Sequence, residues 1–147
     1  MRSIHLALLA CLLLSACGGV DPDSPEGLRQ SLFKQMLKTS EELGGMLRGR
    51  IRYDERRFAE GARHLDELAS QPWQHFPQVD ADQRSTARPE VWQQQAHFQQ
   101  LADELESATA ALLRVATQAD VARGDLQAPL QRVESACKTC HESFRAY

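Results

Sequence analysis

The sequence places two cysteines and a histidine within the five residues CKTCH, close to its C-terminus. Cys137 and Cys140 are separated by two residues and His141 follows directly, so on a helix all three side chains share one face. Two thiols at this spacing can each add across a vinyl group of haem to form a thioether, and the adjacent histidine can reach the iron from one side. The pattern therefore predicts covalent haem attachment, with His141 as an axial ligand.

Three other interpretations of CKTCH remain open. A disulfide between Cys137 and Cys140 would have poor geometry inside a helix and would leave His141 unexplained. A zinc site would need a fourth ligand, and the sequence has neither a second C-x-x-C nor a pair of histidines at ligand spacing. The motif could also be incidental in a helical envelope lipoprotein without haem, in which case mass spectrometry would find no covalent haem.

The N-terminus has the layout of an export signal. Arg2 precedes an apolar run from Ile4 to Leu14, which is shorter than the about 20 apolar residues that a membrane-spanning helix needs. Residues 14–17 resemble the lipobox of bacterial lipoproteins, which implies that Cys17 carries lipid after cleavage. The alternative is plain secretion, although Leu14 fits poorly in the third position before a cut after Ala16.

The chain of 147 residues is long enough for one domain with one core. Cleavage before Cys17 removes Arg2 and leaves 16 basic residues against 20 acidic ones, a formal net charge of −4, which argues against a nucleic-acid partner. We predict a signal peptide over residues 1–16, a lipid-bearing tether over 17–24 and a helical bundle over 25–147. The expected location is the bacterial cell envelope, lipid-anchored and facing the periplasm, in the outer membrane because Gly18 rather than aspartate follows Cys17.

Amphipathic patterns predict helices in the first half of the chain. Ser24 is a suitable N-cap for the first helix, with Pro25 at its first position. Asp54 is a suitable N-cap for a second helix that ends before Pro72. Residues 71–88 show no period and contain aromatic side chains, which favours a packed loop.

Two further helices are predicted in the second half. Pro89 opens the third, whose apolar residues repeat at alternating steps of three and four. Gly124 and Asp125 supply a break and a cap for the fourth, and Pro129 fits only in its first turn. Four such helices with short connections predict an all-α, antiparallel four-helix bundle.

Four stretches of the sequence resemble the cytochromes c′, which are the class II cytochromes c. They are the C-terminal CKTCH, LRQSLFKQM in the first helix, the FP pair at residues 76–77 and ARPEVW before the third helix. The resemblance extends from about residue 28 to residue 147. It implies that the last helix of the bundle holds one haem c through Cys137 and Cys140, with His141 as the single proximal ligand.

The resemblance also implies a set of residues around the haem. Arg29 matches an arginine near the haem propionates, and Gln30 follows it. Phe33 occupies the position whose side chain covers the distal face of the iron. Phe76 belongs to the FP pair, and Arg145 matches an arginine near the proximal pocket.

These residues predict a function that does not involve hydrolysis. Phe33 cannot ligate iron, so the iron would stay five-coordinate and high-spin and could bind small gases. Phe33 donates no hydrogen bond either, which disfavours O₂ more than NO or CO. The first hypothesis is therefore gas binding, with nitric oxide capture or a redox role with electron donors or acceptors in the envelope. The sequence has no phosphate loop and no nucleophile paired with a base, and members of the resembled family often form homodimers.

The second hypothesis is a low-spin electron-transfer cytochrome. Met36 lies three residues after Phe33, and a thioether opposite His141 would fill the sixth position of the iron. Methionine at helical spacing is also a common core residue. His97 is another histidine whose distance from the iron needs to be examined.

Overall fold

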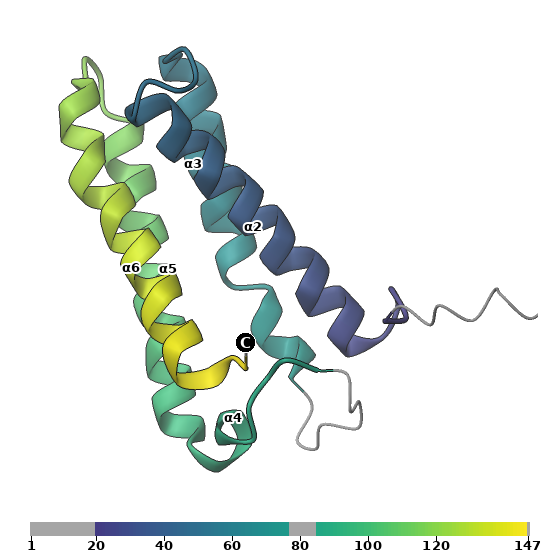
Figure 1. Ribbon diagram of the computed structural model, residues 1–147. Coiled ribbons are helices and arrows are strands. Elements are labelled where there is room, and N and C mark those ends of the chain that lie inside the picture. Colours follow the sequence, from purple (N-terminus) through teal and green to yellow (C-terminus); the bar gives the residue numbers. More distant parts are fainter. Residues whose placement is uncertain (1–19, 77–84, 147) are drawn as a thin grey trace, which may run out of the picture.

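The computed structural model describes residues 20–76 and 85–146, and this part of the chain is mostly helical. Helices α2, α3, α5 and α6 form the predicted antiparallel four-helix bundle (Figure 1). None of the helices in these residues is long and apolar enough to cross a membrane. The elements in chain order are α2 (Pro25–Leu47), α3 (Glu55–Ala69), the 3-10 helix η1 (Pro72–His75), α4 (Glu90–Gln93), α5 (Gln95–Ala116), the 3-10 helix η2 (Arg123–Leu126) and α6 (Gln127–Phe144).

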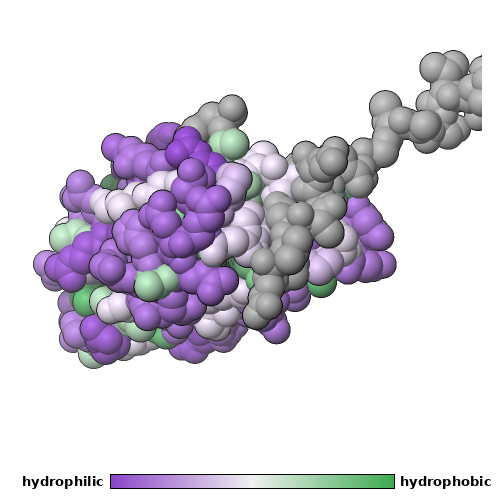
Figure 2. Space-filling view, turned by 90° about the horizontal axis from the view of Figure 1, so that it is seen from below, coloured by the Kyte–Doolittle hydropathy of each residue, from purple (hydrophilic) through white to green (hydrophobic). Residues whose placement is uncertain are grey.

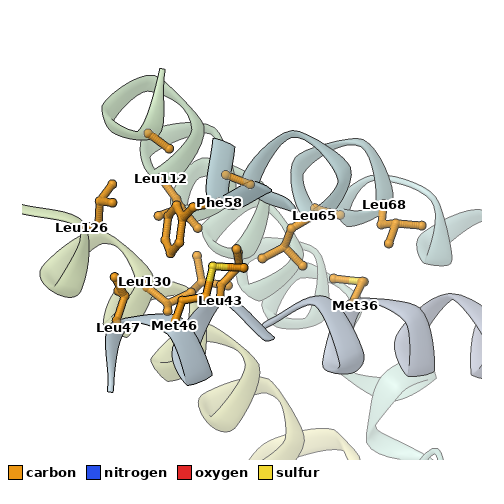
Figure 3. Close-up of a cluster of buried hydrophobic side chains, with 14 of the residues drawn as sticks. Met36, Leu43, Met46, Leu47, Phe58, Leu65, Leu68, Leu112, Leu126 and Leu130 are labelled. Atoms are coloured by element: carbon orange, nitrogen blue, oxygen red, sulfur yellow. The ribbon is translucent and has the colours of Figure 1, made fainter. Parts of the chain in front are cut away.

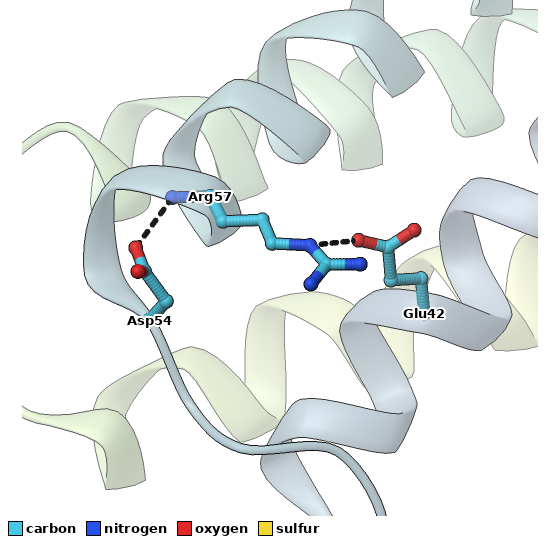
Figure 4. A network of polar contacts seen from close by, with 3 residues as sticks. All are labelled: Glu42, Asp54 and Arg57. Carbon is cyan, nitrogen blue, oxygen red and sulfur yellow. Dashed lines mark hydrogen bonds and ion pairs between the residues drawn. The ribbon is translucent and has the colours of Figure 1, made fainter.

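The first two long helices begin at the predicted caps. The Ser24 side chain accepts a hydrogen bond from the Gly27 N–H at 3.0 Å, and the Asp54 side chain accepts one from the Arg57 N–H at 2.9 Å. Arg57 also donates from Nε to Oε1 of Glu42 at 2.6 Å (Figure 4). The start of α3 is thereby linked to α2.

Two clusters of apolar side chains fill the bundle. The main cluster draws on all four long helices and is largely aliphatic (Figure 3). The second cluster is smaller, consists of buried Val91, Leu101 and Phe144, and has half-buried Phe76 and Phe98 packed against it. One end of the bundle is therefore rich in aromatic rings. The labelled residues of the main cluster are Met36, Leu43, Met46, Leu47, Phe58, Leu65, Leu68, Leu112, Leu126 and Leu130.

The third helix is not continuous, contrary to the prediction. Pro89 begins only the four-residue helix α4, and α5 starts again after Gln94, which has φ −122° and ψ 47°. The break directs Val91 into the second cluster, where it is buried. The helical period of the sequence does not reveal the break, because residues on both sides of it have good helix spacing.

Asp125 does not cap the fourth helix, which corrects a second prediction. It lies in η2, and α6 begins at Gln127 after Leu126, with no side-chain cap. The backbone of η2 takes the place of the cap, since the Gln127 N–H donates to the carbonyl of Gly124. Pro129 lies in the first turn of α6, as predicted.

The surface at the lower end of the bundle is mainly hydrophilic. Apart from the grey atoms, hydrophobic residues on this face are scattered between charged and polar ones (Figure 2). Of the tether predicted over 17–24, residues 21–24 form a turn in which the Ser24 N–H donates to the Asp21 carbonyl at 3.1 Å. The predicted signal peptide and Cys17 lie outside the described residues.

Candidate functional site

Helix α6 presents Cys137, Cys140 and His141 on one face, as predicted from their spacing. All three side chains are half-buried rather than fully enclosed in the core. Cys137 packs against the main cluster and Cys140 against the second cluster, so the motif lies where the two clusters meet. Both cysteines are free thiols, so the structure does not contain the alternative disulfide.

The surroundings of these side chains favour their neutral forms. Burial raises the pKa of Cys137, and burial followed by the neighbouring Cys137 raises the pKa of Cys140 to about 11. Burial, followed by the positive charge of Arg145, lowers the pKa of His141. A neutral imidazole keeps a lone pair for a metal, and a half-buried pair of thiols suits attachment to an apolar group. The donor set therefore fits haem c.

Phe33 of α2 lies opposite the motif. Its ring centroid is 6.4 Å from that of His141, with the planes at 80°. In Figure 1 the first half of α2 and the last turns of α6 lie at the same end of the bundle, with η1 and the C-terminal end of the chain beside them. The structure thus brings together the predicted distal residue and the predicted iron ligand.

Further aromatic rings pack behind Phe33 and form with it an aromatic wall, which consists of Phe33, Trp73, Phe76, Phe98 and Phe144. Trp73 and Phe76 of η1 and its C-cap lie 6.0 and 6.5 Å from the Phe33 ring, measured between centroids. Phe98 of α5 lies 4.9 Å from Phe76, and Phe144 of α6 lies 5.2 Å from Phe98. The wall therefore joins four segments of the chain.

Trp73 and Phe98 are part of this wall but were not predicted as site residues. Trp73 was expected in a packed loop, and Phe98 was expected on a helix seam. A signal for Trp73 exists in the sequence, because it precedes Phe76 by three residues and such residues align in a 3-10 turn. No comparable local signal marks Phe98, since only the packing of α5 beside η1 brings it to the site.

Arg29 is a buried cation at the site, with 4% of its surface exposed. Its guanidinium donates from Nη1 to the carbonyl of His75 at 3.0 Å and from Nη2 to Oγ of Ser85 at 2.7 Å. It also lies 4.8 Å from the centroid of the Phe76 ring. Arg29 therefore fixes η1 and residue 85 against α2, next to the aromatic wall.

Gln30 and Arg145 are less directly involved. Gln30 donates from Nε2 to Oε1 of Glu26 at 2.8 Å, one turn back along α2. Arg145 has an exposed side chain, and its backbone N–H donates to the carbonyl of His141 at 3.0 Å. The backbone bridge between Arg145 and Ala87 ties the end of α6 to the segment that precedes α4. Arg145 thus interacts with His141 through its backbone N–H and through its charge.

Met36 and His97, the other side chains considered as iron ligands, have different surroundings. Met36 is 4% exposed and belongs to the main cluster, beside the labelled leucines of α3 (Figure 3). His97 is exposed and its ring lies against Phe144, with centroids 5.5 Å apart. Within residues 20–76 and 85–146, no group of three or more His, Cys, Asp or Glu side chains could hold a metal ion by itself, so the zinc alternative gains no support there.

Comparison with known proteins identifies the family. The sequence model of the family described as Cytochrome C' matches residues 27–145. Cytochrome c′ of Alcaligenes xylosoxydans xylosoxydans is 26% identical over 124 residues, covering 84% of this chain and 94% of that protein. Cytochrome c-554 of Cereibacter sphaeroides is 31% identical over 122 residues, covering 80% and 89%.

The fold comparison agrees with the sequence comparison. The nitric oxide complex of a variant of cytochrome c′ from Alcaligenes xylosoxidans superposes with a TM-score of 0.76 at 25% identity, covering 88% of this chain and 99% of that one. Since sequence and fold agree over most of its length, this chain belongs to the cytochrome c′ family, whose proteins carry covalently bound haem c.

Proposed function

We propose that this protein binds nitric oxide or carbon monoxide at a haem iron that has His141 as its only protein ligand. In this proposal Cys137 and Cys140 form the two thioether bonds to haem c. The observation that carries the proposal is the contact between the rings of Phe33 and His141, with centroids 6.4 Å apart. Phenylalanine has no lone pair for a metal, and an iron with one open position can take a small diatomic ligand.

The side chains near Phe33 support NO and CO over O₂. Bound O₂ carries partial negative charge and is stabilised by a hydrogen-bond donor, which Phe33 lacks. The indole N–H of nearby Trp73 already donates to Oε1 of Glu106 at 2.8 Å. The nitric oxide complex of a mutant of the Alcaligenes xylosoxidans protein, at 25% identity, supports the same class of ligand.

Four further residues complete the proposed pocket. Arg29 is a buried cation beside the aromatic wall, so it can attract the propionate carboxylates of a haem. Gln30 is its neighbour on α2, and Phe76 supplies apolar surface. Arg145 helps to keep His141 neutral by lowering its pKa, after the larger effect of burial.

The proposed role in the cell is nitric oxide capture, or electron exchange with donors or acceptors in the envelope, rather than catalysis. A visible absorption spectrum of the purified protein, before and after addition of NO, tests the ligation. We expect a high-spin, five-coordinate spectrum in the ferrous state that changes on addition of NO. A low-spin, six-coordinate spectrum at neutral pH without added ligand would contradict the proposal.

The second candidate function is low-spin electron transfer with Met36 as sixth ligand. It is favoured by the position of Met36 one turn from Phe33 on α2. The burial of Met36 in the main cluster favours a core role instead. If the spectrum is low-spin, Met36→Leu should convert it to high-spin, and an unchanged spectrum would remove Met36 as a ligand.

We also propose that residues 1–16 are a signal peptide, that 17–24 form a lipid-bearing tether and that 25–147 form the bundle. Lipid on Cys17 would hold the protein at the envelope, facing the periplasm and in the outer membrane. Metabolic labelling with palmitate tests this, with Cys17→Ala as the control that should lose the label. Mass spectrometry of the same sample measures covalent haem, and its absence would favour a haem-free lipoprotein.

Homodimer formation is a separate question. It can be measured by light scattering on the bundle, residues 25–147.

A further inference from the structure

Trp73 lies in η1, a 3-10 helix of only four residues, and its side chain is hydrogen-bonded to helix α5. Its indole Nε1–H donates to Oε1 of Glu106 at 2.8 Å, and both side chains are half-buried. A hydrogen bond to a carboxylate is stronger than one between neutral groups, and partial exclusion of water strengthens it further. This bond therefore fixes the position of the indole ring relative to α5.

The fixed indole ring in turn contacts Phe33. The ring centroids of Trp73 and Phe33 are 6.0 Å apart, with the planes at 61°. The Trp73 ring also contacts Phe98 of α5, with centroids 5.8 Å apart and planes at 84°. Edge-to-face packing of this kind is favourable between aromatic rings. Trp73 thus connects the α5 helix to the ring that faces His141.

Phe76, the second aromatic neighbour of Phe33 in this segment, is held by a different side chain. Phe76 lies 4.8 Å from the Arg29 guanidinium, and Arg29 also holds the carbonyl of His75. Arg29 therefore holds the η1 backbone and the Phe76 ring, whereas the hydrogen bond to Glu106 holds the Trp73 indole itself. The two supports of Phe33 can be removed separately.

We infer that Trp73, through its hydrogen bond to Glu106, is a positioning residue that holds the Phe33 ring over the open side of the iron and so limits the rate of ligand binding. This inference rests on the proposed function. When the bond to Glu106 is lost, the indole can move and Phe33 gains access to other rotamers. Nitric oxide or carbon monoxide should then reach the iron faster.

Three substitutions in α5 separate the hydrogen bond from other effects. Glu106→Leu removes the acceptor at similar side-chain length, and Glu106→Gln keeps a carbonyl oxygen as acceptor. Glu104→Leu is the matched control, because it removes an exposed carboxylate of the same helix that accepts a hydrogen bond from Gln100. Trp73→Phe removes the N–H while keeping an aromatic ring.

The first measurement is ultraviolet resonance Raman spectroscopy of the haem-containing protein, whose indole N–H band reports hydrogen bonding in any state of the iron. The Trp73 band is obtained as the difference between the wild type and Trp73→Phe. It should shift toward that of a free N–H in Glu106→Leu and stay unchanged in Glu104→Leu. An unchanged Trp73 band in Glu106→Leu would show that Glu106 does not hold the indole and would overturn the inference.

The second measurement is the rate of carbon monoxide binding after flash photolysis. Glu106→Leu and Trp73→Phe should bind carbon monoxide about three to ten times faster, as expected for the loss of one aromatic contact, while Glu106→Gln and Glu104→Leu should match the wild type. In a Phe33→Ala background, Glu106→Leu should add no further acceleration, because the ring that Trp73 positions is gone.

The outcomes distinguish this inference from the proposed function. A wild-type protein that binds no carbon monoxide overturns the proposed function and the inferred control of binding with it. If the wild type binds carbon monoxide, an equal acceleration by Glu106→Leu with and without Phe33 overturns the inference alone, since the effect would then be a general loosening of the bundle. Equal rates in the wild type and Glu106→Leu, with a shifted indole band, would overturn it as well.

Discussion

At the scale of single residues, burial moves the pKa values of a cysteine and a histidine in the site further from neutral pH than on an exposed surface. The pKa of Cys140 is raised to about 11 and that of His141 is lowered, in both cases mainly by burial. At neutral pH both groups are therefore uncharged, and the nearest opposing side chain, Phe33, is uncharged too. The site consequently has apolar walls and one neutral imidazole, that of His141, with the buried charge of Arg29 at its edge.

Tyr53 gives a prediction at the same scale but away from the site. Its hydroxyl is buried and has no hydrogen-bond partner among the described residues, and burial, followed by the charge of Glu55, raises its pKa above 10.0. Tyr53→Phe removes this unpaired hydroxyl. We expect the free energy of unfolding at neutral pH to stay the same or to rise by up to about 1 kcal/mol in urea titrations.

The pH dependence of Tyr53→Phe should differ from that of the wild type. Because the pKa of Tyr53 is higher in the folded state, the unfolded chain loses its phenol proton first as the pH rises. The stability contributed by the neutral phenol is intact below pH 10 and is lost as the pH rises from 10.0 toward the folded-state pKa. The variant should therefore lose less stability in that range, and an identical loss in both proteins would contradict the raised pKa.

At the scale of helices, a buried polar contact joins α3 to α5. Thr109 is fully buried, and its Oγ1 lies 3.0 Å from Oδ1 of Asp66 and 3.0 Å from the carbonyl of Glu106. This contact lies three residues along α5 from the anchor of Trp73. The packing of α5 against α3 therefore contributes to the position of the aromatic wall.

Replacing Thr109 tests this contact. Thr109→Val keeps the shape of the side chain but removes the donor to Asp66, so the free energy of unfolding should fall by about 1 to 2 kcal/mol. Thr117→Val, at the exposed end of the same helix, removes a hydroxyl bonded only to carbonyls of its own helix and should change it by less than about 0.5 kcal/mol. Chemical denaturation of both variants measures these free energies. Equal effects would show that the buried hydrogen bond of Thr109 stabilises the fold no more than the exposed hydroxyl of Thr117 does.

The helix boundaries show which features local sequence can predict. Ser24 and Asp54 cap α2 and α3 as expected, because a cap depends on one side chain and the N–H groups of the next turn. The break at Gln94 and the replacement of Asp125 by the η2 backbone were not predicted. Both depend on where Val91 and Leu126 are buried in the folded bundle.

At the scale of the whole molecule, the two apolar clusters differ in composition and in how they contact the residues of the site. The main cluster is built largely from aliphatic side chains of all four long helices, and Phe33, Trp73 and Cys137 of the site pack only against its surface. The second cluster includes Phe76, Phe98 and Phe144, which surround the end of α6. The bundle should therefore stay helical without haem, whereas the aromatic end should become less stable.

Removal of the proposed attachment residues tests this division. In the double variant Cys137→Ser and Cys140→Ser, covalent haem should be lost while far-ultraviolet circular dichroism still shows a helical protein. The thermal midpoint should fall by roughly 5 to 10 °C, as expected when a bound group that stabilises the folded state is lost. The matched control is Thr139→Ala, at the exposed position between the cysteines, which should keep both haem and midpoint. A haem-free protein with an unchanged midpoint would show that haem does not stabilise the bundle.

The sequence by itself determined the all-α bundle, the caps of the first two helices and the grouping of Cys137, Cys140 and His141 on one face. These features follow from helical periodicity and from contacts between residues a few positions apart. The tertiary structure alone decided that Trp73 and Phe98 join the wall behind Phe33, and that Glu106 holds Trp73. Such contacts join segments far apart in the chain, so they depend on how the helices pack rather than on any local pattern.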